Sequence, residues 1–230
     1  SRISNGKILC ATLQKSPTNL SDRKDAAVAT VFYRPQALET IARRTLNEYD
    51  PMYLNGSPRA VPIETIIEKT FGLRIEYQYL TNDARELGRM IYDSGITTYY
   101  DRDRGDYALM RVEGGTMLIE ASLLEDERCY GRLRFTLAHE LAHHIIHKRI
   151  FSGTGVAAAL YNHDANEDAT EWQANYLAKA ILMPNGQVKR CFYALRPVCR
   201  SKSEFVCKMA EIFEVSKQAM EIRLKEFALI

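Results

Sequence analysis

The chain has 230 residues, the length of one large domain or of one domain with an appendage. Hydrophobic residues make up 46% of it and charged residues 26%, which excludes a disordered or low-complexity chain and predicts a sizeable core. The 31 Lys and Arg residues nearly balance the 29 Asp and Glu residues, giving a net charge of +2. This balance argues against a protein whose main role is to bind the phosphates of nucleic acid.

The sequence also argues against contact with a membrane. Its longest apolar run, 156–161, has six residues, whereas a membrane-spanning helix needs about 20. The five cysteines form an odd set without a Cys-x-x-Cys pair, which fits reduced thiols better than a disulfide framework. We therefore expect the protein in a reducing cytoplasm.

The first third of the chain has an irregular start followed by two helices. Residues 1–35 show no sustained period apart from a candidate strand at 7–13, and the sequence assigns no role to this N-terminal segment. From Pro35 onward, apolar residues recur at three- and four-residue steps, which predicts an amphipathic helix. A second helix is predicted at 62–71, ending before Gly72.

In the middle of the chain, apolar and polar residues alternate as they do in β-strands. Alternation of apolar and polar residues predicts strands within four stretches, 74–80, 88–92, 96–100 and 107–122. The last stretch is broken by Gly114 and Gly115. These strands predict one small, mostly antiparallel sheet.

The rest of the chain has helical periodicity. Helices are predicted at 127–147 and 164–183, and shorter ones follow within 187–230. The expected fold is α+β, with the sheet packed on the first of these helices and on the next one, and with a helical C-terminal tail. We expect an N-terminal segment at 1–35, a main domain at 36–186 and a helical subdomain at 187–230.

The most informative motif is His-Glu-x-x-His at residues 139–143. His139 and His143 are four residues apart in a predicted helix, so their imidazoles lie on one face and can bind one metal ion. Glu140 can reach a water on that metal without being a ligand, which suits a catalytic base. The helix is apolar on most of its surface, and buried His and Glu side chains need a polar partner. The motif therefore predicts a metal site.

A catalytic zinc site takes three protein ligands and keeps one position open. Ile146 and Arg149 stand where a longer His-Glu-x-x-His-x-x-Gly-x-x-His motif needs Gly and His, so the third ligand must come from elsewhere. Glu171 is favoured, because it lies in the middle of the next helix among small apolar neighbours. Glu167 is the alternative, although it lies near the helix start, where a carboxylate also interacts with the helix dipole. His163 ranks third.

Three further polar residues lie near these candidates. His147 continues the histidine face by one turn, and we expect a structural hydrogen bond there, because a fourth protein ligand would close the site to water. Asn175 lies one turn after Glu171, where it either supports a ligand histidine or bonds to the backbone as a core amide. His144 is expected to point away from the site.

Three blocks of sequence, in this order, resemble the ImmA/IrrE family of bacterial and phage metallopeptidases. They are RFTLAHELAHHIIH at 134–147, EWQANYLAKAILMP at 171–184 and FEVSKQAMEIRLKEF at 213–227. Residues 60–64 and the strands before the motif helix also resemble the family, so the resemblance covers roughly 36–230. It implies a zinc-dependent endopeptidase of gluzincin-like layout, with His139, His143 and Glu171 as metal ligands and Glu140 as the catalytic base.

The resemblance also implies a class of substrate. Members of the family cleave or inactivate helix-turn-helix repressors and so switch on genes of mobile elements, phages or stress responses. The repressor would here be a separate chain. The expected metal is Zn²⁺, although two histidines and a carboxylate also accept Mn²⁺.

Two other functions remain open from the sequence. One is a non-proteolytic, metal-containing module that binds and sequesters a repressor. The other is a regulator that contacts DNA through the C-terminal helices, since 187–230 carries nine Lys and Arg against five Asp and Glu. This excess is modest, so we do not expect nucleic acid as the main partner.

Overall fold

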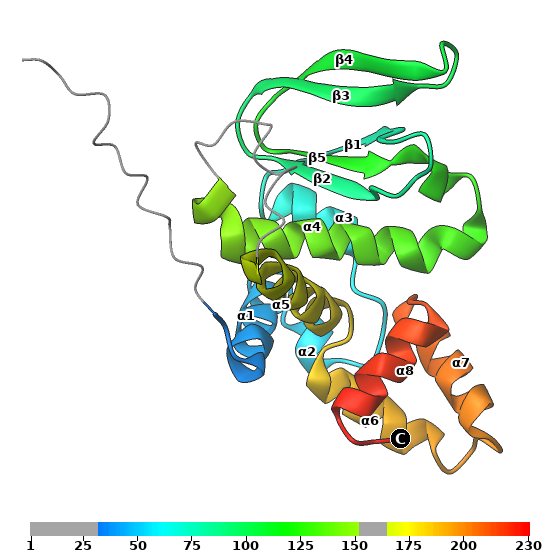
Figure 1. The fold of residues 1–230 in the computed structure, drawn as a ribbon. Helices are drawn as coiled ribbons and strands as arrows, with labels where there is room; N and C mark the ends of the chain where they lie inside the picture. The colour runs from blue at the N-terminus through cyan, green and yellow to red at the C-terminus, as the bar shows by residue number, and fades with distance from the viewer. Residues whose placement is uncertain (1–31, 152–164) are drawn as a thin grey trace, which may run out of the picture.

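The computed structural model describes residues 32–151 and 165–230 (Figure 1). The predicted strand at 7–13, most of the N-terminal segment and the candidate ligand His163 lie outside these residues. The described part of the chain consists of small sheets and several helices, which confirms the α+β class. None of the described helices combines the length and the apolar composition needed to cross a bilayer.

The two predicted helices of the first third are confirmed. Helix α1 (Pro35–Tyr49) starts at a proline, whose fixed φ suits the first helical position, and it buries the predicted stripe through Leu38, Ala42 and Leu46. Helix α3 (Ile63–Lys69) is followed by Gly72, which has a φ of +64°. A short helix between them, α2 (Met52–Asn55), was not predicted, because a single turn has no periodicity to recognise.

The strands form two sheets instead of the single sheet that was predicted. The strands are β1 (Arg74–Gln78), β2 (Gly88–Ile91), β3 (Gly95–Asp101), β4 (Asp106–Val112) and β5 (Thr116–Glu120). Strand β5 lies between β1, to which it is parallel, and β2, to which it is antiparallel, while β3 and β4 form a separate hairpin above them (Figure 1). Gly115, with a φ of +82°, lets the chain leave the hairpin and enter the central strand.

A buried arginine joins the two sheets. Arg89 of β2 donates from Nη1 to the hydroxyl of Thr97 at 2.5 Å and to the carbonyl of Thr98 at 3.1 Å, both on β3. Its other nitrogens bind the two carboxylate oxygens of Glu86 at 2.6 Å. A buried guanidinium needs such a complete set of acceptors, and here they fix the hairpin over β2.

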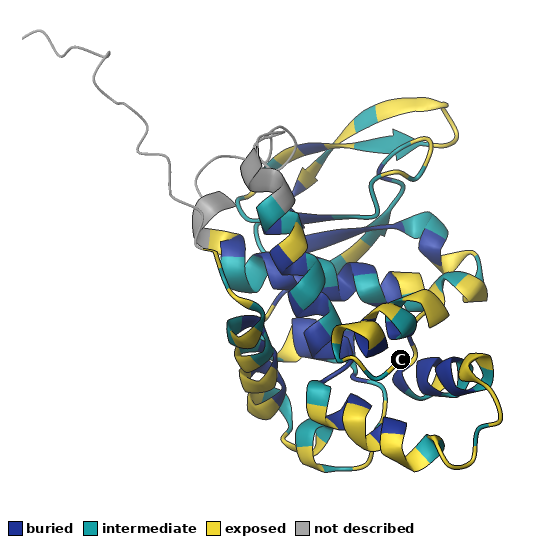
Figure 2. Ribbon diagram, turned by 60° about the horizontal axis from the view of Figure 1, so that its bottom comes forward, coloured by how far each residue is buried: buried dark blue, intermediate teal, exposed yellow. Residues whose placement is uncertain are grey.

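Two long helices form the centre of the molecule. Two short 3₁₀ turns, η1 (Ala121–Leu124) and η2 (Glu127–Cys129), precede α4 (Tyr130–Phe151), and α5 (Ala165–Leu182) follows it. Helix α4 lies against β2 on one side and α5 on another, and buried alanines at their contact let the two helices approach closely. Figure 2 shows buried residues on these inner faces and exposed residues on the outer hairpin.

The C-terminal helices pack on this centre. The predicted helical tail is confirmed as α6 (Asn185–Leu195), α7 (Lys202–Phe213) and α8 (Lys217–Glu226). The turn between α7 and α8 lies against α4 so closely that a Cβ on Gly131 would be 2.8 Å from the backbone nitrogen of Ser216. Arg134 of α4 donates to the carbonyl of Glu214 in that turn at 3.0 Å and to the carbonyl of Val61 at 2.7 Å.

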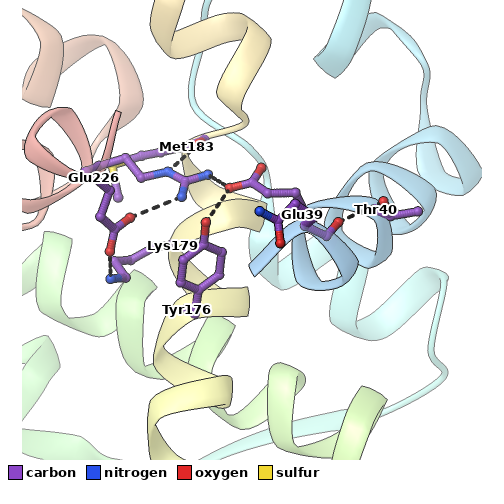
Figure 3. A network of polar contacts seen from close by, with 8 residues as sticks. Glu39, Thr40, Tyr176, Lys179, Met183 and Glu226 are labelled. Atoms are coloured by element: carbon purple, nitrogen blue, oxygen red, sulfur yellow. Dashed lines mark hydrogen bonds and ion pairs between the residues drawn. The ribbon is translucent and has the colours of Figure 1, made fainter. Parts of the chain in front are cut away.

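A third buried arginine holds α8 against α1 and α5. The side chain of Arg223 is 0% exposed, and it donates to the carbonyl of Met183 at 3.1 Å and to Glu39 at 2.6 Å. Figure 3 shows this network. Tyr176 of α5 donates to Glu39 at 3.2 Å, and Glu226 joins Arg223 to Lys179. Arg223 and Glu39 are 184 positions apart in the chain, and their contact thus helps to fix the second half of α5 between them.

We expect Arg223→Met to destabilise the protein by about 3 kcal/mol, because it leaves the partly buried Glu39 without its cation. For a chain of this size the midpoint of thermal unfolding should fall by roughly 6–12 °C. The matched control is Lys202→Met, which removes an exposed ion pair with Glu221 and should leave the unfolding midpoint nearly unchanged. Equal unfolding midpoints for the two variants would contradict this role of Arg223.

Candidate metal centre

The structure brings the three predicted ligands together. His139 and His143 lie on successive turns of α4, and α5 places Glu171 opposite them. The two Nε2 atoms are 3.0 Å apart, and they lie 3.3 Å and 3.0 Å from the oxygens of Glu171. One ligand atom from each residue lies within 4.8 Å of the others. The side chain of the alternative ligand Glu167 lies outside those that the structure describes.

This donor set suits a divalent metal ion. Two imidazoles and one carboxylate are ligands that zinc accepts, and three protein ligands leave one position for water or substrate. Burial raises the pKa of Glu171, but hydrogen bonds from His139 and His143 outweigh this effect and hold the pKa well below its usual range. Glu171 is therefore an anion at neutral pH, which is the form that binds a metal ion.

Each candidate histidine ligand has a contact at its other ring nitrogen. Nδ1 of His139 lies 3.1 Å from Oδ1 of Asn175, so Asn175 supports a histidine, one of the two roles considered from the sequence. Nδ1 of His143 lies 3.1 Å from Nδ1 of His147. Burial, together with the charge of His143, lowers the pKa of His147 to about 4, so His147 is neutral at pH 7.

His144 faces a different part of the molecule, as expected. Its ring stacks on Tyr92 at 6.2 Å between centroids and meets the ring of Phe71 edge-on at 6.1 Å. Burial lowers its pKa to about 4. His144 is therefore a neutral packing residue behind the site.

Glu140 lies beside the cluster in a buried position, with 8% of the residue exposed. Burial raises the pKa of its carboxyl group, although the nearby His139 and His143 lower it. The start of β2 lies directly against this side chain. A Cβ on Gly88 would be 2.8 Å from both Cγ and Oε1 of Glu140 and 2.9 Å from Cγ2 of Thr136. Gly88 therefore makes the room that Glu140 occupies.

The sequence reasoning missed Gly88. The available signal was a glycine at the start of a predicted strand, which often marks the close approach of another group. The φ of Gly88 lies outside the left-handed region, so the backbone itself does not require glycine there. Glycine is required there because Thr136 and Glu140 of α4 lie so close, and no local sequence pattern shows this contact.

These residues line a cleft of about 550 Å³ between β2, α4 and α5. The candidate ligands and Glu140 form one part of its wall. The rest of the wall includes the apolar and aromatic side chains of Leu87, Met90, Tyr92 and Phe135 and the charged side chains of Arg85, Glu86 and Arg89. A cleft in which polar groups converge beside apolar surface is typical of a site that binds a ligand.

We expect Gly88→Ala to lower the rate constant of any reaction that uses Glu140 by about 10- to 100-fold, because the added methyl group displaces the carboxylate. Metal content should not change. Adding Thr136→Ser to Gly88→Ala removes Cγ2 and should recover part of the rate. The matched control is Gly186→Ala, whose Cβ would have no neighbour within 4 Å. A parental rate for Gly88→Ala would show that the carboxylate does not need this space.

Comparisons with known proteins identify a related family. Residues 123–225 match the family model of the IrrE N-terminal-like domain of the M78 peptidases. No curated protein matches the sequence. A solved structure described as a Mycobacterium tuberculosis transcriptional regulator is similar, with 16% sequence identity and a TM-score of 0.47 over 81% of this chain and 55% of the other. The present chain thus spans about half the length of that structure.

The segment that matches the family model contains η2 and α4 to α7. It therefore includes the His-Glu-x-x-His motif and Glu171. The resemblance found in the sequence is confirmed: residues 123–225 are similar to the IrrE N-terminal-like domain, which supports a metallopeptidase of the ImmA/IrrE family.

Proposed function

We propose that the protein is a zinc-dependent endopeptidase in which His139, His143 and Glu171 hold the metal ion and Glu140 is the general base. The observation that supports this function most strongly is the convergence of the three ligand atoms within 4.8 Å of one another. The match of residues 123–225 to a metallopeptidase family model supports it independently. Zinc is the ion that this donor set favours, and manganese is the alternative.

When bound, the metal ion supplies Lewis-acid activation of water and of the substrate carbonyl. The residues of the chain transfer the proton and hold the reacting groups in position. The Glu140 carboxylate accepts a proton from the water that attacks the peptide carbonyl, and it then delivers that proton to the nitrogen of the leaving amine. Gly88 and Thr136 fix the position of this carboxylate, and Asn175 fixes the ring of His139.

The cleft also fits a peptide chain. Strand β2, which lines it, is an edge strand of its sheet and pairs with β5 on one side. An extended peptide can pair with such an edge through main-chain hydrogen bonds and so lie next to Glu140. This arrangement favours a protein substrate over a small molecule.

For the substrate, we propose a helix-turn-helix repressor in the same cytoplasm. Its cleavage would derepress genes of mobile elements, phages or stress responses. This class comes from the family resemblance. We further propose that 36–186 is the peptidase domain and that 187–230 is a helical subdomain, which packs on it through Arg223 and the turn at Glu214.

The test is to incubate the protein with the repressor encoded beside its gene, with and without a chelator. We expect a defined cleavage product that disappears with the chelator and returns when zinc is added back. Tight binding of the intact repressor without any cleavage would contradict the peptidase function, and it would support the alternative of a module that sequesters its partner.

A further inference from the structure

The histidine face of α4 continues one turn beyond the proposed metal ligands. His147 is 0% exposed, and its Nδ1 lies 3.1 Å from Nδ1 of His143. The opposite nitrogen of His143, Nε2, lies 3.0 Å from Glu171 and 3.0 Å from Nε2 of His139. The two nitrogens of His143 therefore face different groups: Nε2 faces the proposed metal centre, and Nδ1 faces His147.

The chemistry of the imidazole ring decides which nitrogen carries the proton. A neutral histidine that binds a metal ion through Nε2 has its hydrogen on Nδ1, and that hydrogen needs an acceptor when the ring is buried. Nδ1 of His147 lies at hydrogen-bonding distance and accepts it when the hydrogen of His147 is on Nε2. With a metal ion on Nε2 of His143, the contact places the hydrogen of His143 on Nδ1 and the hydrogen of His147 on Nε2.

We propose that His147 is a positioning residue of the metal centre, whose Nδ1 accepts the Nδ1–H of His143 and so keeps Nε2 of His143 free of a proton and directed at the metal ion. The proposal rests on the proposed function only in taking His139, His143 and Glu171 as metal ligands. Asn175 acts in the same way on His139 through an amide oxygen.

His147 is not a fourth ligand in this arrangement. It contacts His143 at Nδ1, on the side of the ring opposite the Nε2 that faces Glu171. An acceptor at this place orients the ligand ring and makes it more basic, and losing such a contact typically weakens metal binding by about 10- to 100-fold.

The test measures the zinc affinity of the full-length protein by competition with a chromophoric chelator. His147→Phe keeps the size of the ring but removes the acceptor, and we expect about 10- to 100-fold weaker zinc binding. His147→Asn places an amide oxygen close to the lost nitrogen and should recover most of the affinity. The matched control, His144→Phe, changes a histidine of the same helix that packs on Tyr92, and its zinc affinity should equal that of the parent.

Substitution with Co²⁺ gives a second measurement, because its visible absorption bands report the ligand field. We expect shifted bands for His147→Phe and parental bands for His147→Asn. Parental zinc affinity in His147→Phe would overturn the proposal. An equal loss of affinity in both variants would also overturn it, because the residue would then act through packing alone. Peptide cleavage does not enter these measurements, so a protein that binds zinc but cleaves nothing would refute the proposed function and leave this result standing.

Discussion

We expect Glu140→Gln to retain its zinc and to cleave its substrate roughly 10²- to 10⁴-fold more slowly than the parent, the range over which a positioned general base contributes to catalysis. Glu140 is not one of the three residues whose ligand atoms converge, so metal binding does not depend on it. Glutamine has nearly the same shape as glutamate and fits the space beside Gly88 and Thr136. It cannot accept a proton, so the reaction loses both proton transfers that Glu140 performs.

The measurement combines the zinc content of the purified variant with its rate of repressor cleavage. The control is Glu127→Gln, which neutralises an exposed carboxylate just before α4 and should leave both quantities unchanged. If Glu140→Gln derepresses target genes as well as the parent does, hydrolysis is not the mechanism, and sequestration of the repressor becomes the better explanation.

The elements of this fold could be predicted because each has a local cause. The apolar stripe of α1 and the alternation along β1 are properties of neighbouring residues, and the structure confirms both. The two glycines between β4 and β5 also mark their break correctly. The start of α4 was predicted three residues too early, because Asp126 accepts from the backbone nitrogen of Arg128 and forms a 3₁₀ turn first.

The pairing of the strands could not be predicted in the same way. Strand β5 pairs in parallel with β1, from which β2 and a whole hairpin separate it in the chain. The hairpin is a second sheet, joined to the first through the buried Arg89. From the sequence alone, charged residues such as Arg89 and Arg223 are expected at the surface, and only their distant partners explain why they are buried.

The residues of the candidate site also differ in whether local sequence could predict them. His139, Glu140 and His143 lie close together on one helix, so their spacing alone indicated a metal site. Gly88 acts only through the packing of β2 on α4, which the sequence does not reveal. The preference for Glu171 over Glu167 depended on small residues between two helices, and the structure places Glu171 at the histidines. Its role as a ligand is a prediction that metal binding can test.

We expect Glu171→Gln to weaken zinc binding by more than about 100-fold, which exceeds the loss that follows from removing an outer hydrogen-bond partner. The hydrogen bonds that hold the pKa of Glu171 low show that the two histidines favour its anionic form, and an amide cannot supply that charge. Glu167→Gln is the matched control. It changes the other candidate carboxylate on the same helix and should bind zinc as the parent does.

Thermal or chemical unfolding gives a measurement that is independent of chelator competition, because an ion that binds only the folded state stabilises it. Zinc at 100 times the parent's Kd stabilises the parent by about 2.7 kcal/mol, and it should stabilise Glu171→Gln by less than about 0.5 kcal/mol. The reverse order, with Glu167→Gln losing the stabilisation and Glu171→Gln keeping it, would show that Glu167 is the ligand. The hydrogen bonds of Glu171 to the histidines would then belong to the metal-free protein alone.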